Sequence, residues 1–462
     1  MGSRITDSAL YGHLWGTDEL RASFDETARI QSWLEILAEL AGAQAELGLI
    51  PEEAAEAIAG SARVELLDMD LVVRETRATG HSTLGLIRGL QGVLPAEARE
   101  WVYYGATVQD LTDTWTALTM KRVGGIVWRD LRLVEASLLD LAEAHGDTVM
   151  AGRTHGQIGS PITFGFKAAG WADEARRHLD RLRELPGRCL AGQLGGGVGS
   201  LAFFGDQGID LRRRFCERLG LADPGISWTS SRDRVQEFAH LLALVASTLG
   251  RIGNEVYELQ RPEIAELREP AGEAGVGSIT MPHKRNPELS EHLVTLARLA
   301  RSSAAVILEG TVTEHERDGR AWKAEWVALP EVCLLTGTAL QFALKILGGL
   351  EVNEAAMRRN LDGWEVSERA LSLLSPVLGK HTAQAELQTA LADGRRKGLS
   401  IKESLADLLG EHLTTEAADS LFGPADTGLC AQMADEVVAR CRRERADETD
   451  EWPDNRKEPD IA

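Results

Sequence analysis

The chain has 462 residues, which exceeds the length at which one hydrophobic core usually stops growing, so two or three domains are expected. Hydrophobic residues make up 44% of the chain and aromatic residues only 5%, a composition that favours helices around a large core. The net charge of −21 argues against a nucleic-acid partner, because binding to phosphates needs a basic surface, whereas a local cationic pocket can still hold a small anionic substrate.

The first predicted elements are short helices over residues 1–110, joined by turns. One of them carries an apolar run that begins at Trp33, and it is expected to end before Pro51. A stretch with few helix breakers follows from Thr112 to about His145, and its apolar residues recur at helical spacing. This part of the sequence predicts a small helical domain followed by one long helix.

Three further long helices are predicted over residues 233–259, 288–309 and about 325–347, the last of them bent at Pro330. Their apolar residues recur at steps of three and four, which is the pattern of amphipathic helices. Several long helices with few breakers between them indicate a helical bundle, and no run of alternating apolar and polar residues suggests a major sheet. The expected fold class is therefore all-α.

Three domains follow from this pattern: an N-terminal helical domain (1–110), a central long-helix bundle (111–352) and a C-terminal helical domain (353–462). The end of the C-terminal domain, from Arg442 to Ala462, is charged and contains two prolines. We therefore expect a disordered tail there.

The cysteines are isolated and odd in number, without a Cys-x-x-Cys pair: Cys189, Cys216, Cys333, Cys430 and Cys441. Such thiols indicate free cysteines in a reducing compartment rather than disulfides or a zinc site. The N-terminal region lacks the apolar core of a signal peptide, and no stretch is expected to span a membrane. A cytoplasmic protein without a membrane partner is expected.

One loop between the long helices combines several chemically useful side chains. It reads Gly277-Ser278-Ile279-Thr280-Met281-Pro282-His283-Lys284-Arg285-Asn286-Pro287 and follows a glycine-rich run. Glycines allow a loop to move, and amides near a helix start can hold an anion. Ser278, Lys284 and Asn286 offer a proton acceptor, a cation and a hydrogen-bond donor. By composition alone, an ordinary loop before a helix is the favoured interpretation.

This loop resembles the signature of the fumarase/aspartase superfamily, Gly-Ser-x-x-Met-Pro-x-Lys-x-Asn-Pro, at every fixed position. Two more segments resemble family loops: Gly105-Ala106-Thr107-Val108-Gln109-Asp110, in which Val108 replaces a usual serine, and Gly152-Arg153-Thr154-His155-Gly156-Gln157. Thr79-Gly80-His81 resembles a histidine segment of the adenylosuccinate lyase branch. The resemblance covers about residues 10–440. It implies the three-domain fold of the family, a homotetramer built on a long-helix core, and sites shared between subunits.

The resemblance also implies a lyase without cofactor or metal, which breaks a bond beta to a carboxylate of a small dicarboxylate-type substrate by anti elimination. Ser278 corresponds to the base and His155 to the acid that protonates the leaving group, while Lys284 and Asn286 stabilise the aci-carboxylate. The substrate-binding residues expected are His81, Thr107, Gln109, Thr154, Gln157, Arg232 and Met281. The fork of Arg232 suits a carboxylate clamp, although an ion pair with a neighbouring helix explains it equally well.

Two competing motifs are weaker. The glycine-rich run from Gly195 to Ser200 lacks the Lys-Ser/Thr of a phosphate-binding loop, so a structural turn near the site is expected. Glu314, His315 and Glu316 do not form a metal site, because adjacent helical residues point in different directions and no second histidine lies four residues away.

The sequence gives mixed indications about the reaction. The stretch from Leu14 to Leu20 lacks the Arg-Tyr pair usual in adenylosuccinate lyases, which disfavours adenylosuccinate. The segment from His315 to Trp326 resembles 3-carboxy-cis,cis-muconate cycloisomerases, which generally lack the histidine that His155 represents. We expect a carbon–nitrogen lyase that releases fumarate and either nitrite, as nitrosuccinate lyases do, or an amine. A cycloisomerase is the second interpretation and an adenylosuccinate lyase the third. A structural role, like that of the argininosuccinate lyase-type crystallins, is the non-enzymatic one.

Overall fold

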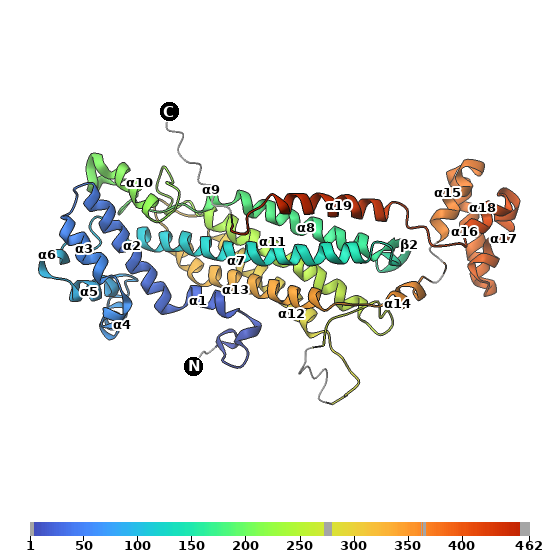
Figure 1. Ribbon diagram of the computed structural model, residues 1–462, viewed down its shortest axis with the longest axis horizontal. Helices are drawn as coiled ribbons and strands as arrows, with labels where there is room; N and C mark the ends of the chain where they lie inside the picture. The colour runs from blue at the N-terminus through green and yellow to red at the C-terminus, as the bar shows by residue number, and fades with distance from the viewer. Residues whose placement is uncertain (1–3, 272–279, 362, 364–365, 453–462) are drawn as a thin grey trace.

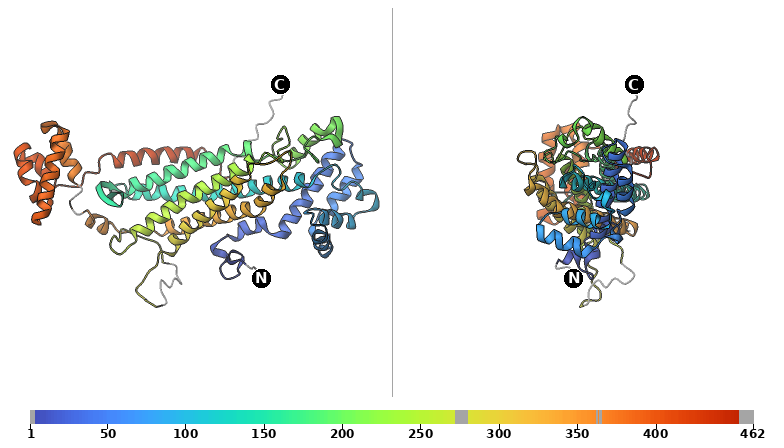
Figure 2. Two further views of the ribbon diagram at one scale, coloured as in Figure 1. Left: turned by 180° about the vertical axis from the view of Figure 1, so that it is seen from behind. Right: turned by 90° about the vertical axis from the view of Figure 1, so that its left-hand side faces the viewer.

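A computed structural model of the chain shows an elongated, mostly helical molecule (Figure 1). The structure describes residues 4–271, 280–361, 363 and 366–452. Short helices form one end, long helices form the middle, and a second group of short helices forms the opposite end (Figures 1 and 2). The all-α fold class expected from the sequence is confirmed.

The N-terminal domain is built from short helices around its own apolar core. Its longest helix is α2, which buries Leu34, Leu37 and Leu40 on one face and ends at Glu46, before Pro51 as predicted. The α-helices of this domain are α1 (Asp18–Phe24), α2 (Glu26–Glu46), α3 (Glu52–Ser61), α4 (Met69–Thr79), α5 (Leu84–Val93) and α6 (Ala96–Arg99). Three 3-10 turns accompany them at Ile5–Asp7, Gly12–Leu14 and Val64–Leu66.

Six longer helices make the central bundle: α7 (Val108–Ala144), α8 (Phe164–Glu184), α11 (Asp233–Leu259), α12 (Glu288–Glu309), α13 (Gly319–Gly348) and α19 (Cys430–Ala446). They share one hydrophobic core, to which α11 contributes Val235, Leu242, Leu249 and Val256 at steps of seven residues. Shorter elements connect them at α9 (Pro186–Cys189), η4 (Ala202–Gln207) and α10 (Gly208–Arg218). The bounds of α11 and α12 coincide with the predicted ranges.

Helix α13 begins at Gly319, six residues before the predicted start, because the Asp318 carboxylate accepts a hydrogen bond from the Arg320 amide and caps the helix. Pro330 lies inside the helix. By length and composition alone, α13 is apolar enough to cross a membrane, contrary to the expectation that no stretch is. Because 67% of its most apolar stretch is buried within the bundle, its composition is that of a core helix.

The described residues form two sheets of two strands each, in agreement with the prediction that no major sheet exists. Strands β1 (Val149–Thr154) and β2 (Gln157–Thr163) make an antiparallel hairpin between α7 and α8. Strands β3 (Leu267–Arg268) and β4 (Glu351–Val352) pair near the end of the bundle. Neither the hairpin nor α8 is predicted by the sequence pattern.

The C-terminal part differs from the predicted domain. Helix α14 (Glu354–Arg359) leads to a separate group formed by α15 (Ser367–Leu378), α16 (Lys380–Lys397), α17 (Ile401–His412) and α18 (Thr415–Ser420). The chain then returns, and α19 lies along α8 in the bundle (Figures 1 and 2). The expected disordered tail from Arg442 is wrong up to Trp452, because Trp452 Nε1 donates to the Leu182 carbonyl at 2.8 Å. Residues 453–462 lie outside the described residues.

Candidate functional site

The candidate residues form two groups at opposite ends of the bundle. Thr107 and Gln109 lie at the start of α7, whereas the hairpin with His155 follows its end. A helix of 37 residues is about 55 Å long at ~1.5 Å per residue. One chain therefore does not hold both groups at one site.

The first group is organised by the N-terminus of α7. Thr107 caps the helix in a reciprocal capping box with Asp110. The buried Asp110 carboxylate also accepts hydrogen bonds from the amides of Gly195 and Gly196, at 2.8 and 3.0 Å. Burial raises its pKa to about 6. The glycine-rich run is thus a structural turn beside the site, as predicted, and it holds the Thr107 loop through Asp110.

Arg317, which is not among the site residues expected from the sequence, gives this group a cationic centre. Its Nη1 donates to Thr107 Oγ1 at 3.1 Å. Its Nε and Nη2 are buried and have no hydrogen-bond partner among the described residues. Tyr103 lies beside it, in a left-handed backbone conformation (φ 61°), and burial together with the nearby Asp110 raises its pKa. A guanidinium with free donors next to a hydroxyl is suited to bind a carboxylate.

His81 lies on the loop between α4 and α5, and its ring orientation follows from two backbone contacts. The Nδ1 atom accepts hydrogen bonds from the amides of Leu84, at 3.2 Å, and Thr83, at 3.4 Å. Because Nδ1 accepts, the proton of the neutral ring is on Nε2. The exposed side of His81 therefore presents a hydrogen-bond donor.

Arg232 and Gln109 were expected to bind the substrate, but the structure buries both side chains. Arg232 is 1% exposed, and all three of its nitrogens are bonded to Asp113 and Glu325, with distances of 2.7 Å to Asp113 Oδ2 and 2.9 Å to Glu325 Oε1. Burial opposes its charge, but the two carboxylates raise its pKa. Gln109 is also fully buried, and its amide donates to Asp113 and to the Thr229 carbonyl. The ion-pair interpretation of Arg232 is thus favoured, and both residues support the site from behind.

The second group is carried by the β1–β2 hairpin. His155 and Gly156 occupy its tip with φ of 52° and 73°, the two positive values of a type I′ turn. Thr154 and Gln157 pair across the turn. Just before them, Arg153 forms a two-pronged ion pair with the buried Glu266, at 2.9 and 2.5 Å. This pair anchors the hairpin to the chain after α11 and leaves the exposed His155 ring at the tip.

The signature loop belongs to the same end as the hairpin. The candidate base Ser278 lies outside the described residues. Met281 and Lys284 are exposed, and the Lys284 amide donates to the Met281 carbonyl at 2.9 Å. Asn286 is half-buried just before α12, whose first amides at Leu289 and Ser290 are capped by the carboxylate of Glu269. The Lys284 side chain is thus presented on the surface of one chain.

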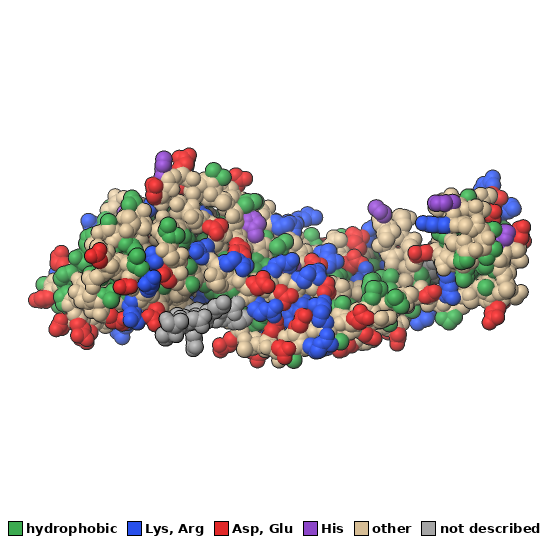
Figure 3. Space-filling model, turned by 90° about the horizontal axis from the view of Figure 1, so that it is seen from above, with side chains coloured by type: hydrophobic (Ala, Val, Ile, Leu, Met, Phe, Trp, Pro, Cys, Tyr) green, Lys and Arg blue, Asp and Glu red, His purple; other side chains and the backbone are tan. Residues whose placement is uncertain are grey.

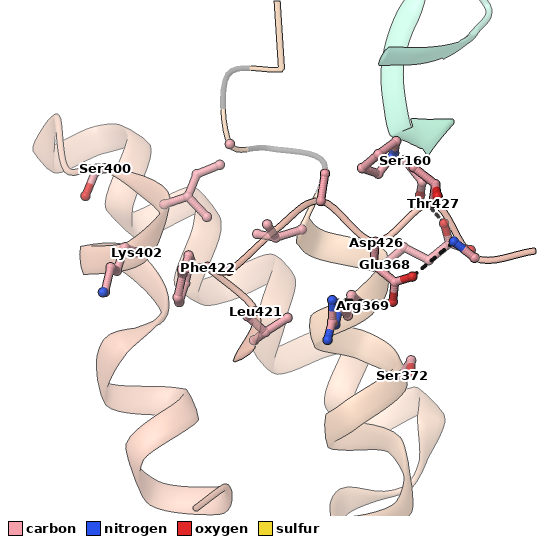
Figure 4. A pocket seen from close by; sticks show the side chains of 17 residues that line it. Ser160, Glu368, Arg369, Ser372, Ser400, Lys402, Leu421, Phe422, Asp426 and Thr427 are labelled. Carbon is pink, nitrogen blue, oxygen red and sulfur yellow. Dashed lines mark hydrogen bonds and ion pairs between the residues drawn. The ribbon is translucent and has the colours of Figure 1, made fainter. Parts of the chain in front are cut away.

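A cavity of about 650 Å³ lies elsewhere, between β2 and the C-terminal helices (Figure 4). Its charged groups are already paired: Glu368 hydrogen-bonds Ser160, and Arg369 lies 3.4 Å from Asp426. Lys402 lies over the Phe422 ring at 5.3 Å. None of the candidate residues lines this cavity. Within the described ranges, no group of three metal-ligating side chains comes together either.

Comparison with known proteins places the chain among lyases. The sequence model of the family described as Lyase matches residues 15–300. The N-acetyl-S-(2-succino)cysteine lyase of Dickeya dadantii (strain 3937) is 41% identical, over 95% of this chain and 98% of that protein. The nitrosuccinate lyase of Streptomyces davaonensis is 37% identical, over 91% and 92%. The crystal structure of 3-carboxy-cis,cis-muconate lactonizing enzyme from Pseudomonas putida is 32% identical with a TM-score of 0.86, covering 94% of this chain and 99% of that chain.

Proposed function

Because the chain belongs to the fumarase/aspartase superfamily of lyases, we propose that it cleaves a 2-substituted succinate by anti β-elimination and releases fumarate. The observation that supports this reaction is the Arg317 guanidinium, whose free donors lie beside the Thr107 hydroxyl and suit a substrate carboxylate. The leaving group proposed first is the thiolate of an N-acylated cysteine. Two relatives called N-acetyl-S-(2-succino)cysteine lyase, 41% and 40% identical, support it.

In the proposed reaction, Ser278 removes the proton from the carbon that bears no sulfur. The electron pair forms the new double bond after passing through an aci-carboxylate, which Lys284 and Asn286 stabilise. The carbon–sulfur bond then breaks, and its electron pair leaves with the sulfur. His155 donates the proton that the leaving group takes up. Thr154, Gln157 and Met281 are proposed to contact the substrate, and His81 to donate a hydrogen bond to it.

The nitrogen leaving group that the sequence indicates, nitrite or an amine, is the second candidate. The nitrosuccinate lyase relative favours it, at 37% identity over 91% of this chain. The need for an acid separates the candidates. An amine leaves as a strong base and requires a proton. A free thiol has a pKa of about 8.5, so a thiolate is a weaker base and needs the proton less. Nitrite departs unprotonated.

Product identification tests the proposal. N-acetyl-S-(2-succino)cysteine, nitrosuccinate, adenylosuccinate and the cycloisomerase lactone are offered separately, with fumarate followed by absorbance and thiol, nitrite and amine assayed directly. We expect fumarate and free thiol in equal amounts from the first compound. Turnover of the lactone alone would reassign the protein to the cycloisomerases. His155→Ala is expected to slow thiol release severalfold. This loss of rate should be partly compensated at low pH, where solvent supplies the proton.

We further propose that the enzyme is a cytoplasmic homotetramer whose sites combine the two groups of residues from different subunits. The separation of Thr107 and His155 by the length of α7 supports a shared site. Exposed apolar residues on three bundle helices, Leu244, Leu299 and Val327, support association through the bundle.

A further inference from the structure

A cavity of about 400 Å³ lies between the N-terminal domain and the bundle. Its aromatic lining is Phe24, Trp33, Trp115, Trp322 and Trp326, and these residues define what we call the tryptophan pocket. Four of the eleven tryptophans of the chain line this one cavity, although aromatic residues make up only 5% of the sequence. Its size is within the range of about 300–1,000 Å³ that small-molecule sites occupy.

The tryptophan rings meet edge to face and leave an apolar space between α2, α7 and α13. Trp33 and Trp115 have ring centres 6.4 Å apart, and Trp322 and Trp326 have ring centres 4.8 Å apart. Trp326 is 43% exposed, so one wall of the pocket faces solvent. An exposed tryptophan wall costs solvation free energy in a free chain, which a bound apolar group would offset.

The pocket is lined by residues that neighbour the Thr107 group in sequence or through a hydrogen bond. Thr112 lines it and donates to the carbonyl of Val108, the residue after Thr107. Ser82 lines it and directly follows His81. Glu325, the buried partner of Arg232, also lines it. Trp322 and Trp326 lie on the first turns of α13, which begins at Gly319, two residues after Arg317.

We propose that the tryptophan pocket binds the leaving group of the substrate and selects an apolar N-acylated thiol or amine that carries one carboxylate. This proposal rests on the proposed elimination reaction. Aromatic rings contact sulfur and acyl groups favourably. The single carboxylate is received by Arg77, which lines the pocket and has no ion-pair partner among the described residues, with Arg29 over the Trp33 ring.

The charges of the lining argue against a nucleotide as leaving group. Glu26 lies 3.9 Å from Arg29 and Glu325 pairs with Arg232, so Arg77 is the lining arginine that no described carboxylate pairs. A monoanion matches this one positive charge, whereas a phosphate dianion would leave a negative charge unmatched beside two carboxylates. The pocket thus separates acylated thiols from nucleotides by charge as well as by shape.

Two variants change the pocket in opposite ways. Trp326→Ala opens it, and Val73→Trp fills its mouth at a position that is already 39% exposed and tolerates bulk. Each variant is assayed with N-acetyl-S-(2-succino)cysteine and with methylthiosuccinate, whose leaving group is too small to reach the tryptophans. We expect kcat/KM for the large substrate to fall about tenfold or more in both variants, with methylthiosuccinate unchanged. Tyr11→Ala, an exposed aromatic outside the pocket, is the matched control.

A binding measurement separates this proposal from the proposed function. N-acetyl-L-methionine, which cannot be eliminated, is titrated calorimetrically into the wild type and both variants. Binding to the wild type that is lost in both variants supports the pocket even if no succinate is cleaved. The pocket assignment would be overturned if kcat/KM fell equally for both substrates or fell for neither. It would also be overturned if the variants bound N-acetyl-L-methionine as well as the wild type does. These outcomes would leave the lyase reaction intact. Thermal melting of each variant shows that the comparison is made on folded protein, and an oligomer change in Val73→Trp would assign the pocket to a subunit contact instead.

Discussion

At the scale of single residues, the carboxylate contact proposed for Arg317 gives the most direct test of the site. Its Nη1 bonds Thr107, and its other donors have no partner among the described residues. Arg317→Ala should lower kcat/KM for the succinyl substrate by about 100-fold, because a charge-assisted pair with a carboxylate contributes ~1.5–3 kcal/mol. Steady-state kinetics measure the loss.

A matched comparison uses lysine. Arg317→Lys keeps the charge but not the fork, so it should recover only part of the activity. An Arg317→Ala enzyme with unchanged KM and kcat would show that the guanidinium does not touch the substrate.

A second residue, His178 on α8, makes stability depend on pH. Its Nδ1 accepts from Arg181 at 3.0 Å, and its Nε2 lies 2.8 Å from Thr248 Oγ1, which donates to Glu174. Burial and the neighbouring Arg181 lower its pKa to about 4. The unfolded chain therefore takes up a proton near pH 6.5 that the folded protein refuses until about pH 4.

Because the pKa of His178 is lower in the folded protein than in the unfolded chain, acid destabilises the folded protein. The contribution of His178 to stability is complete above pH 6.5 and is lost as the pH falls toward 4, by roughly 3 kcal/mol. Urea titrations of the wild type and His178→Gln at several pH values should show this part of the pH dependence only in the wild type. If the unfolding free energy of both proteins changed equally with pH, His178 would not be the group responsible.

Site residues differ in how far the sequence reveals them. The segments around Thr107 and the hairpin histidine are contiguous in sequence, so their resemblance to family loops was enough to predict them. Arg317 lies in the segment from His315 to Trp326 that resembles the cycloisomerases, but its partner Thr107 is 210 positions away, and no local pattern marks that contact. The burial of Arg232 depends on Asp113 and Glu325 from two other helices, so its motif-like setting gave no means of choosing between clamp and ion pair.

At the scale of elements, helix periodicity predicted α11 and α12 to the residue, because long amphipathic helices carry their own signal. The hairpin was missed because its strands contain glycines in place of a clear apolar alternation and one of them contains Pro161. The packing of α19 against the bundle was missed for another reason. Its charged sequence resembles a solvated segment until its partners on α8 are known. Basic and acidic side chains are interspersed on the face that contains α8 and α19 (Figure 3).

The residues after α19 pair with a buried arginine. Arg176 on α8 is fully buried, and its partners are Glu135 on α7 and Glu448 just after α19, at 3.3 and 2.9 Å. Glu448→Ala should cost about 3–5 kcal/mol of unfolding free energy, because it leaves the arginine underpaired in the core. The matched surface variant Arg442→Ala breaks pairs with Asp140 and Glu143 and should cost under ~1 kcal/mol. Similar urea midpoints for the two variants would contradict this account.

At the scale of the whole molecule, the length of the bundle keeps the two groups of site residues apart. Helix α11 runs from the Arg232 end to the Glu266 end and spans about 40 Å over its 27 residues. Lys284 follows its far end, while Thr229 at its near end donates to the carbonyl of Glu316 at 2.7 Å and so places Arg317 there. Arg317 and Lys284 of one chain therefore cannot act on the same small substrate.

Mixing inactive variants tests whether different chains complete each site. Arg317→Ala and Lys284→Ala should each be nearly inactive alone. When the two proteins are dissociated, mixed and reassociated, some hybrid sites receive an intact Arg317 from one chain and an intact Lys284 from another, so activity should return. Arg317→Ala mixed with Thr107→Val is the control, because both changes lie in the same group and every site then contains one of them. Return of activity in the control, or its absence from the first mixture despite hybrid formation shown by native mass spectrometry, would mean that the two groups are not brought together between subunits.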